Sequence, residues 1–148
     1  MPQNKQVSVS AHSQRARKLL FGGLCGGHIA ALACVCVFGI LGGLVAGVSA
    51  AIFAAVTLLF FTIGQAVQVI VADADPRVVL FASLASYIAR VTVLGLLLLA
   101  ALNNRDVLGL DPPAVIITTF VVVVGWLAAE FWVFARLRIP AFDSPGNG

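Results

Sequence analysis

The chain has 148 residues, of which 61% are apolar and 10% are charged, and its mean hydropathy is +1.07. Soluble domains are about 45–50% apolar and about 25% charged, and the surface of so short a chain is too large to be covered by six acidic and nine basic residues. This excludes a soluble monomer, and also a charged nucleic-acid-binding protein despite a pI near 9.1. The composition predicts an integral membrane protein.

The N-terminal half contains one long uncharged stretch. From Leu19 to Ala72 there is no Asp, Glu, Lys or Arg, and since one helix needs about 20 residues to cross a bilayer, two crossings fit. Glycines cluster within this stretch at Gly39, Gly42, Gly43 and Gly47. Because glycine commonly ends a helix or reverses the chain, we expect a first span over 19–40 and a second over 46–72. The stretch is too long for the apolar region of a signal peptide, about 7–15 residues, so the first span is expected to be retained.

Two further apolar stretches predict a third span over 78–102 and a fourth over 114–135. Each contains a single charged residue, Arg90 in the third and Glu130 in the fourth. Pro76, in the short polar segment before the third span, is suited to the first turn of a helix.

The predicted fold class is therefore an all-α membrane protein with four transmembrane helices. The transmembrane domain is expected to cover residues 15–139. Residues 1–14 and 140–148 are polar and contain Pro and Gly, which predicts disordered tails.

The distribution of basic residues predicts the orientation. With both ends of the chain on one side, that side holds Lys5, Arg15, Arg17, Lys18, Arg77, Arg136 and Arg138, and the other side holds Arg105. Because Lys and Arg near the membrane accumulate on the cytoplasmic side, both termini are predicted to be cytoplasmic.

Four polar residues inside the spans are the candidate site: Gln65, Gln68, Arg90 and Glu130. From the rise of an α-helix, all four are expected in one layer in the cytoplasmic half of the membrane. We expect an ion pair between Arg90 and Glu130, flanked by the two glutamines, which share a helix face. Such groups are costly in lipid, and three interpretations remain open: a pair that holds the bundle together, a proton or ion pathway, and a docking site for a partner membrane helix.

Small residues repeat at a spacing of four along the first two spans: Gly22, Gly23, Gly26 and Gly27, then Gly39, Gly43 and Gly47. This spacing lets helices approach closely in lipid, and the contact is either internal or with another protein. His28 is expected to pack near the bundle with a satisfied hydrogen bond rather than to bind metal. The three cysteines, Cys25, Cys34 and Cys36, have no metal-type spacing and are interpreted as small packing residues.

No phosphate-binding loop, catalytic triad or metalloprotease motif occurs in the sequence. We therefore expect no enzymatic activity, no metal site and no cofactor.

Three segments carry a resemblance to a known family: Leu58–Gln68 (LLFFTIGQAVQ), Ser86–Arg90 (SYIAR) and Trp126–Trp132 (WLAAEFW), with basic residues following. Over about residues 15–142 the chain resembles the ATP synthase protein I family, small four-span bacterial proteins, and in particular its actinobacterial members. The resemblance implies a multi-pass protein of the bacterial plasma membrane, beside the proton-driven rotary ATP synthase.

The function that this resemblance implies is assembly of the ring of subunit c, as a chaperone that binds subunit c or the nascent c-ring. Subunit c is a hairpin with a Gly/Ala-rich helix and a membrane-buried carboxylate, which the glycines and the polar layer would suit. The alternatives are a small Mg²⁺ or Ca²⁺ transporter or channel, which would need a homo-oligomer because each chain offers one carboxylate, and a four-span lipid-carrier flippase.

Overall fold

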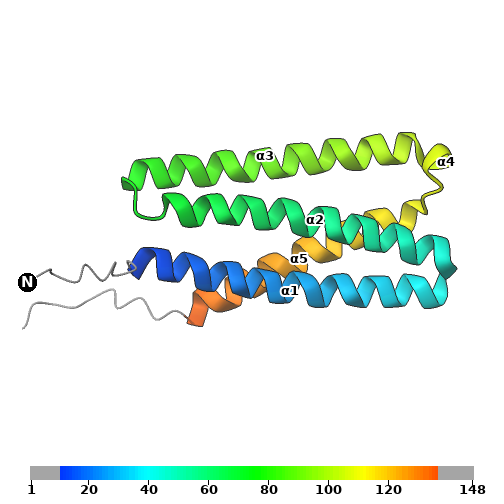
Figure 1. Ribbon diagram of the computed structural model, residues 1–148, viewed down its shortest axis with the longest axis horizontal. Coiled ribbons are helices and arrows are strands. Elements are labelled where there is room, and N and C mark those ends of the chain that lie inside the picture. The colour runs from blue at the N-terminus through cyan, green and yellow to red at the C-terminus, as the bar shows by residue number, and fades with distance from the viewer. Residues whose placement is uncertain (1–10, 137–148) are drawn as a thin grey trace, which may run out of the picture.

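The computed structural model describes residues 11–136, and the side chains from Gln14 onward. Within this range the chain folds into five helices (Figure 1): α1 (Ala11–Leu41), α2 (Gly43–Val71), α3 (Pro76–Asn103), α4 (Arg105–Leu108) and α5 (Pro112–Arg136). All except the short α4 are long and apolar enough to cross a membrane. The prediction of an all-helical fold is confirmed for this part of the chain, with four helices of membrane-spanning length and hydropathy at the expected places.

The turn between α1 and α2 is tighter than the sequence predicted. Only Gly42 separates the two helices, and Gly43 has a φ of +77°, a conformation that is costly for residues with a Cβ. The chain therefore reverses at Gly42 and Gly43. Gly47, which we expected near the turn, lies within α2.

Residues 11–14, which we expected to belong to a disordered tail, are part of α1 instead. The segment that begins α1 is rich in Ala, Gln, Arg and Lys, which are good helix formers, so the helix extends beyond the apolar span. The other residues of the two expected tails, 1–10 and 140–148, lie outside the described range.

The start of α3 has the predicted form. Pro76 is in its first turn, and the carboxylate of Asp75 accepts a hydrogen bond of 2.9 Å from the backbone N–H of Arg77. This is the usual role of Asp before a helix. Farther along, Gly109 ends α4 with a φ of +62°, and the expected loop before the fourth span contains this short helix.

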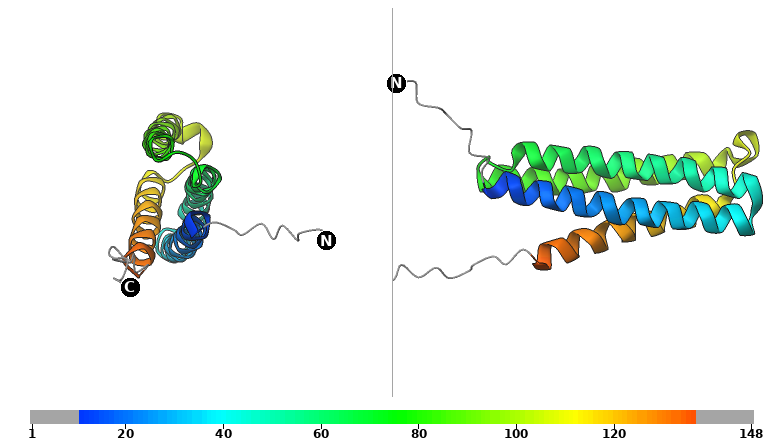
Figure 2. Two further views of the ribbon diagram at one scale, coloured as in Figure 1. Left: turned by 90° about the vertical axis from the view of Figure 1, so that its left-hand side faces the viewer. Right: turned by 60° about the horizontal axis from the view of Figure 1, so that its bottom comes forward.

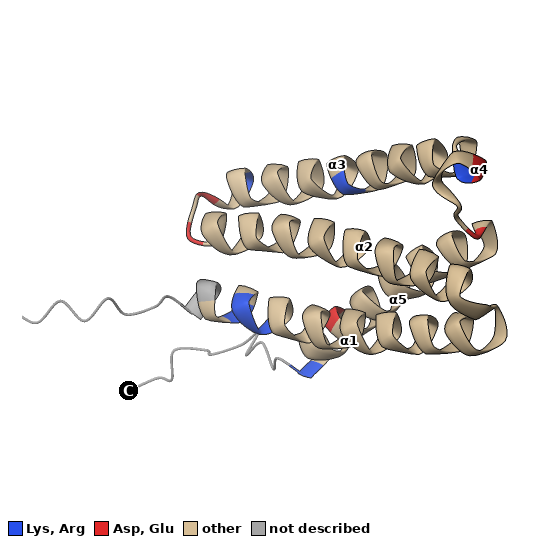
Figure 3. Ribbon diagram, turned by 45° about the vertical axis from the view of Figure 1, so that its right-hand side comes forward, with Lys and Arg blue, Asp and Glu red and all other residues tan. Residues whose placement is uncertain are grey.

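Helices α1, α2 and α5 pack together, whereas α3 lies against α2 and has little contact with α5 (Figure 2). The α2–α3 connection lies at the end of the bundle where α1 begins and α5 ends (Figure 1), and the α1–α2 turn and α4 lie at the opposite end. Charged residues are concentrated near these two ends, with few along the helices between them (Figure 3).

Glycines of α1 form its interface with α5. A Cβ added to Gly23 would lie 2.5 Å from the indole of Trp126, and one added to Gly26 would collide with Ala129 and the backbone of Gly125. Gly22 and Gly27 are equally tight, against Val133 and against Leu58 with Trp126. This first set of glycines therefore serves an internal contact and is not free to bind a partner.

The second set of glycines belongs to the α1–α2 hairpin. A Cβ on Gly47 would lie 2.9 Å from the Cα of Gly39, so these two residues let the helices meet beside their turn, whereas Gly43 has open space around it. Within this second set, Gly39 and Gly47 serve a close helix contact, and Gly43 serves the turn.

Candidate functional site: a polar layer between the helices

Glu130 lies on α5 and is 9% exposed. Its Oε1 accepts a hydrogen bond of 2.7 Å from Trp126 Nε1, and a second from Gln65 Nε2 of α2. Trp126 is four residues earlier on the same helix, the spacing at which helical side chains meet. The carboxylate is therefore held by one donor from its own helix and one from a neighbour.

Arg90 lies on α3 and is 4% exposed. Its Nη2 donates a hydrogen bond of 3.0 Å to Ser86 Oγ, and its Cζ lies 5.5 Å from the ring centre of Phe61 and 5.1 Å from that of Tyr87. Both distances are within the range of cation–π attraction. Within the described residues, its Nε and Nη1 have no hydrogen-bond partner.

Gly64 of α2 provides the space for this arginine. A side-chain carbon at Gly64 would collide with the Arg90 guanidinium, and Ser86 Oγ lies 3.5 Å from the Gly64 carbonyl oxygen, to which it donates. The absence of a side chain therefore lets the guanidinium lie against the backbone of α2.

The predicted ion pair between Arg90 and Glu130 is not formed, although both residues lie in the described range. The reason is the position of α3, which packs on α2 and hardly contacts α5. Arg90 is held by Ser86 and two aromatic rings, while Glu130 is held by Trp126 and Gln65.

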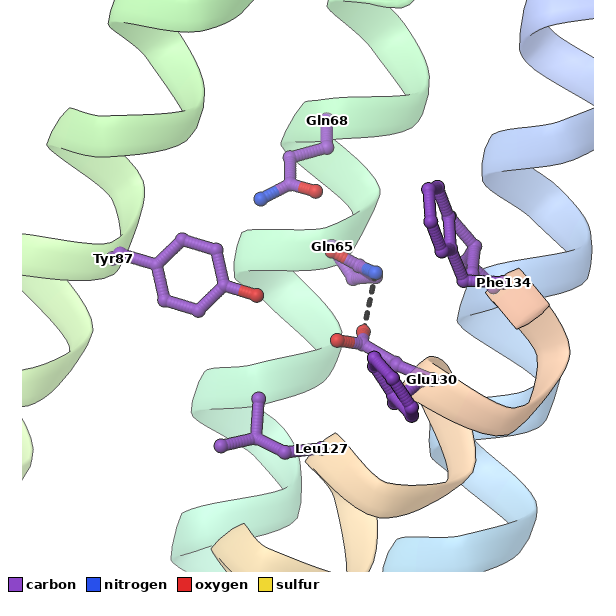
Figure 4. Close-up of a pocket in the computed structure, with 8 residues that line it drawn as sticks. Gln65, Gln68, Tyr87, Leu127, Glu130 and Phe134 are labelled. Atoms are coloured by element: carbon purple, nitrogen blue, oxygen red, sulfur yellow. Dashed lines mark hydrogen bonds between the residues drawn. The ribbon is translucent and has the colours of Figure 1, made fainter. Parts of the chain in front are cut away.

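The two glutamines line one cavity with Glu130 (Figure 4). It measures about 430 Å³ and lies between α1, α2, α3 and α5, and its lining includes Tyr87, Leu127 and Phe134. In the described part of the chain, Gln65 Oε1 and Gln68 Nε2 are buried and have no hydrogen-bond partner. The cavity therefore offers a free acceptor and a free donor beside the carboxylate.

A second cavity of about 240 Å³ contains Arg90. It is lined by Phe61 of α2, by α3 from Arg90 to Leu98, and by Thr119 and Val123 of α5. Because both cavities are bordered by α3 on one side and α5 on the other, we refer to them together as the α3–α5 groove.

The sequence thus predicted the polar residues but not their partners. Gln65, Gln68 and Glu130 come together, and Arg90 lies in the neighbouring cavity. The residues that were missed are Phe61, Gly64, Ser86, Tyr87 and Trp126. Ser86 and Trp126 each lie four residues before the charged residue that they contact, and this helical spacing is a signal that could have found them.

His28 is exposed on α1 rather than packed in the bundle, and its Nδ1 lies 2.7 Å from the Leu24 carbonyl oxygen of its own helix. The expected hydrogen bond is thus present, but on the outer face. Cys34 is buried, and Cys25 and Cys36 are exposed. Residues 11–136 contain no group of three or more His, Cys, Asp or Glu that could hold a metal ion.

Comparison of the chain with protein-family models, with curated proteins and with solved structures found no match.

The four polar residues Gln65, Gln68, Arg90 and Glu130, which we call the polar layer, could bind a polar group of another molecule. The α3–α5 groove presents an arginine with open donors, a carboxylate held in place, and amide groups with unused hydrogen-bonding atoms. In lipid, where water is scarce, such atoms gain most from a polar group on another molecule.

Proposed function

We propose that this protein is an assembly factor for the bacterial F-type ATP synthase, and that it binds subunit c or the nascent c-ring within the plasma membrane. The observation that carries the proposal is the α3–α5 groove, in which buried polar atoms of Gln65, Gln68 and Arg90 lack partners within the described chain. The family resemblance supplies the identity of the partner.

The groove suits a transmembrane helix with a buried acid. A carboxylic acid side chain is costly to leave in lipid, and unassembled subunit c would carry one into the bilayer. The groove would cover this side chain with polar groups until the ring is complete. The glycines of α1 are already packed against α5 and α2, so close approach would depend on small residues of the Gly/Ala-rich partner helix.

We further propose that the end of the bundle bearing the α2–α3 connection faces the cytoplasm. Lys18 of α1, Arg77 of α3 and Arg136 of α5 lie near this end, as their positions in the helices require. The loop at the other end contributes Arg105. The positive-inside rule supports this orientation.

A mild-detergent pull-down of the full chain through a C-terminal tag tests the proposed partner. We expect recovery of subunit c without the rest of the synthase. Gly95→Phe fills the groove, since Gly95 lines it and has open space around it, and should abolish recovery. The matched control is Leu96→Phe, because Leu96 is 60% exposed on the same helix and lies outside the groove lining.

Failure to recover subunit c with a folded, membrane-inserted chain would overturn the proposed partner. Equal recovery with Gly95→Phe and the unaltered chain would show that the groove is not the binding surface.

One observation favours a second candidate, a small divalent-cation channel: Glu130 and two glutamines line a cavity. Mg²⁺ and Ca²⁺ take several oxygen ligands, so an oligomer would be needed to bring more than one carboxylate together. Cation flux into proteoliposomes that disappears with Glu130→Ala would favour this candidate over the assembly factor.

A further inference from the structure

We infer that Arg90 is the residue with which this protein binds a carboxylate, carried by a partner transmembrane helix lying in the α3–α5 groove. The inference deepens the proposed function and rests on it for the partner's name, but the chemistry of the recognised group comes from the site itself.

The first argument is the state of the Arg90 side chain. It is 4% exposed, it makes one hydrogen bond, to Ser86, and its Nε and Nη1 are without partners in the described structure. Arginine has five N–H donors arranged as a planar fork, and a carboxylate is the side-chain group that matches this fork in both charge and geometry. Because Arg90 is buried and forms no ion pair within the described residues, a carboxylate that reached its open donors would gain charge-assisted hydrogen bonds.

The second argument is that Glu130 forms no ion pair with Arg90, although the two groups interact electrostatically. Its Oε1 is held by Trp126 and Gln65, and it lines the neighbouring cavity rather than the one that contains Arg90. The open donors of Arg90 are therefore available to an anion from another molecule.

The third argument is depth, which selects a helix rather than a lipid as the source of the anion. Arg90 is midway along α3, which runs from Pro76 to Asn103, so about 20 Å of helix separates it from either end. The hydrocarbon core is about 30 Å thick, and lipid headgroups lie outside it. A side chain on a membrane-spanning helix reaches this depth without leaving its normal position.

The fourth argument is the shape of the groove. The two cavities that compose it follow one another along the same two helices, and their lining residues together extend from Tyr87 to Leu98 on α3 and from Thr119 to Phe134 on α5. These stretches correspond to about 16 and about 22 Å of helix. Both are several helical turns long, so a partner helix could lie along the groove with its acid at the level of Arg90.

The experiment uses synthetic single-span peptides with a central Asp, compared with the same peptides carrying Asn. Each is mixed with the full-length protein in liposomes, and binding is measured by energy transfer between fluorescent labels. We expect the Asp peptide to bind about tenfold or more tightly than the Asn peptide, since hydrogen bonds to charged groups contribute about 1.5–3 kcal/mol.

Arg90→Gln should remove this preference for Asp. The matched control, Arg77→Gln, should keep it, because Arg77 is an exposed arginine in the first turn of the same helix. Equal binding of the two peptides to the unaltered protein, or a preference that survives Arg90→Gln, would overturn the inference. Equal binding of the two peptides overturns the inference even where Arg90→Gln fails to fold, because that comparison needs no variant of the protein.

The outcomes separate this inference from the proposed function. A preference for the Asp peptide without recovery of subunit c would support carboxylate recognition and reject the proposed partner. Recovery of subunit c with no preference for Asp would support the proposed partner and reject carboxylate recognition by Arg90.

Discussion

At the scale of single residues, the surroundings of Glu130 show how a buried carboxyl group is held by neutral hydrogen-bond donors. Glu130 receives hydrogen bonds from an indole and an amide, both of them neutral donors. Trp126 also fills the space beside two glycines of α1 and is fully buried. Packing and hydrogen bonding therefore depend on the same side chain.

Replacement of Glu130 tests this arrangement. Glu130→Ala would leave the Nε1 of Trp126 and the Nε2 of Gln65 without their acceptor, and we expect a loss of about 1–3 kcal/mol in the free energy of unfolding. Glu130→Gln keeps a carbonyl oxygen as acceptor and should lose less. Denaturant unfolding in mild detergent measures the difference.

Asp106→Ala is the control for this prediction, because the Asp106 side chain is 94% exposed on α4. It should leave the unfolding free energy nearly unchanged. Equal stability of Glu130→Ala and Asp106→Ala would contradict the role assigned to Glu130.

At the scale of helices, the four spans are not equivalent. The helices α1, α2 and α5 are joined by close contacts at small residues, whereas α3 packs mainly on α2 and has few buried residues. In lipid, association of helices depends on packing and hydrogen bonds rather than on hydrophobicity. The glycine contacts between α1 and α5 are thus expected to contribute most to the stability of the bundle. Of the four long helices, α3 is expected to contribute least.

A pair of glycine substitutions tests this difference. Gly26→Ala places a Cβ against Ala129 and the Gly125 carbonyl oxygen, and we expect it to destabilise the bundle by about 1–3 kcal/mol, as overpacking does. Gly95→Ala on α3 meets nothing within 4 Å and should cause no loss.

The same unfolding measurement in detergent compares the two variants. If Gly95→Ala were as destabilising as Gly26→Ala, the loss of stability would reflect glycine replacement in general. The α1–α5 interface would then contribute no more to stability than α3 does.

At the scale of the whole molecule, the alternating direction of four long helices places the start of α1 and the end of α5 at the same end of the bundle. The basic residues Lys18, Arg77 and Arg136 lie near this end. The orientation of the whole chain in the membrane therefore decides which end of the bundle, with its basic residues, faces the cytoplasm.

Reporter fusions test the orientation. We expect fusions at both termini to report the cytoplasm, and a fusion inserted in the loop that contains Arg105 to report the opposite side. A difference between the two termini would contradict the four-span topology, and a shared location outside the cytoplasm would reverse the proposed orientation.

The sequence alone determined the class of the protein, its four spans and the positions of its intramembrane polar residues. This was possible because the spans follow from the length of uncharged sequence, as in Leu19–Ala72, and the bilayer thickness converts that length into crossings. Even the first turn was located to within a few residues by its glycines.

Only the tertiary structure decided how these polar residues are paired. Lipid is as apolar as the side chains that face it, so a span has no polar outer face that would reveal which side packs inward. Sequence reasoning placed Arg90 and Glu130 at compatible depths and joined them, but it could not detect that α3 packs on α2, away from α5. In that packing the two side chains form no ion pair, and Arg90 keeps unused donors in the α3–α5 groove.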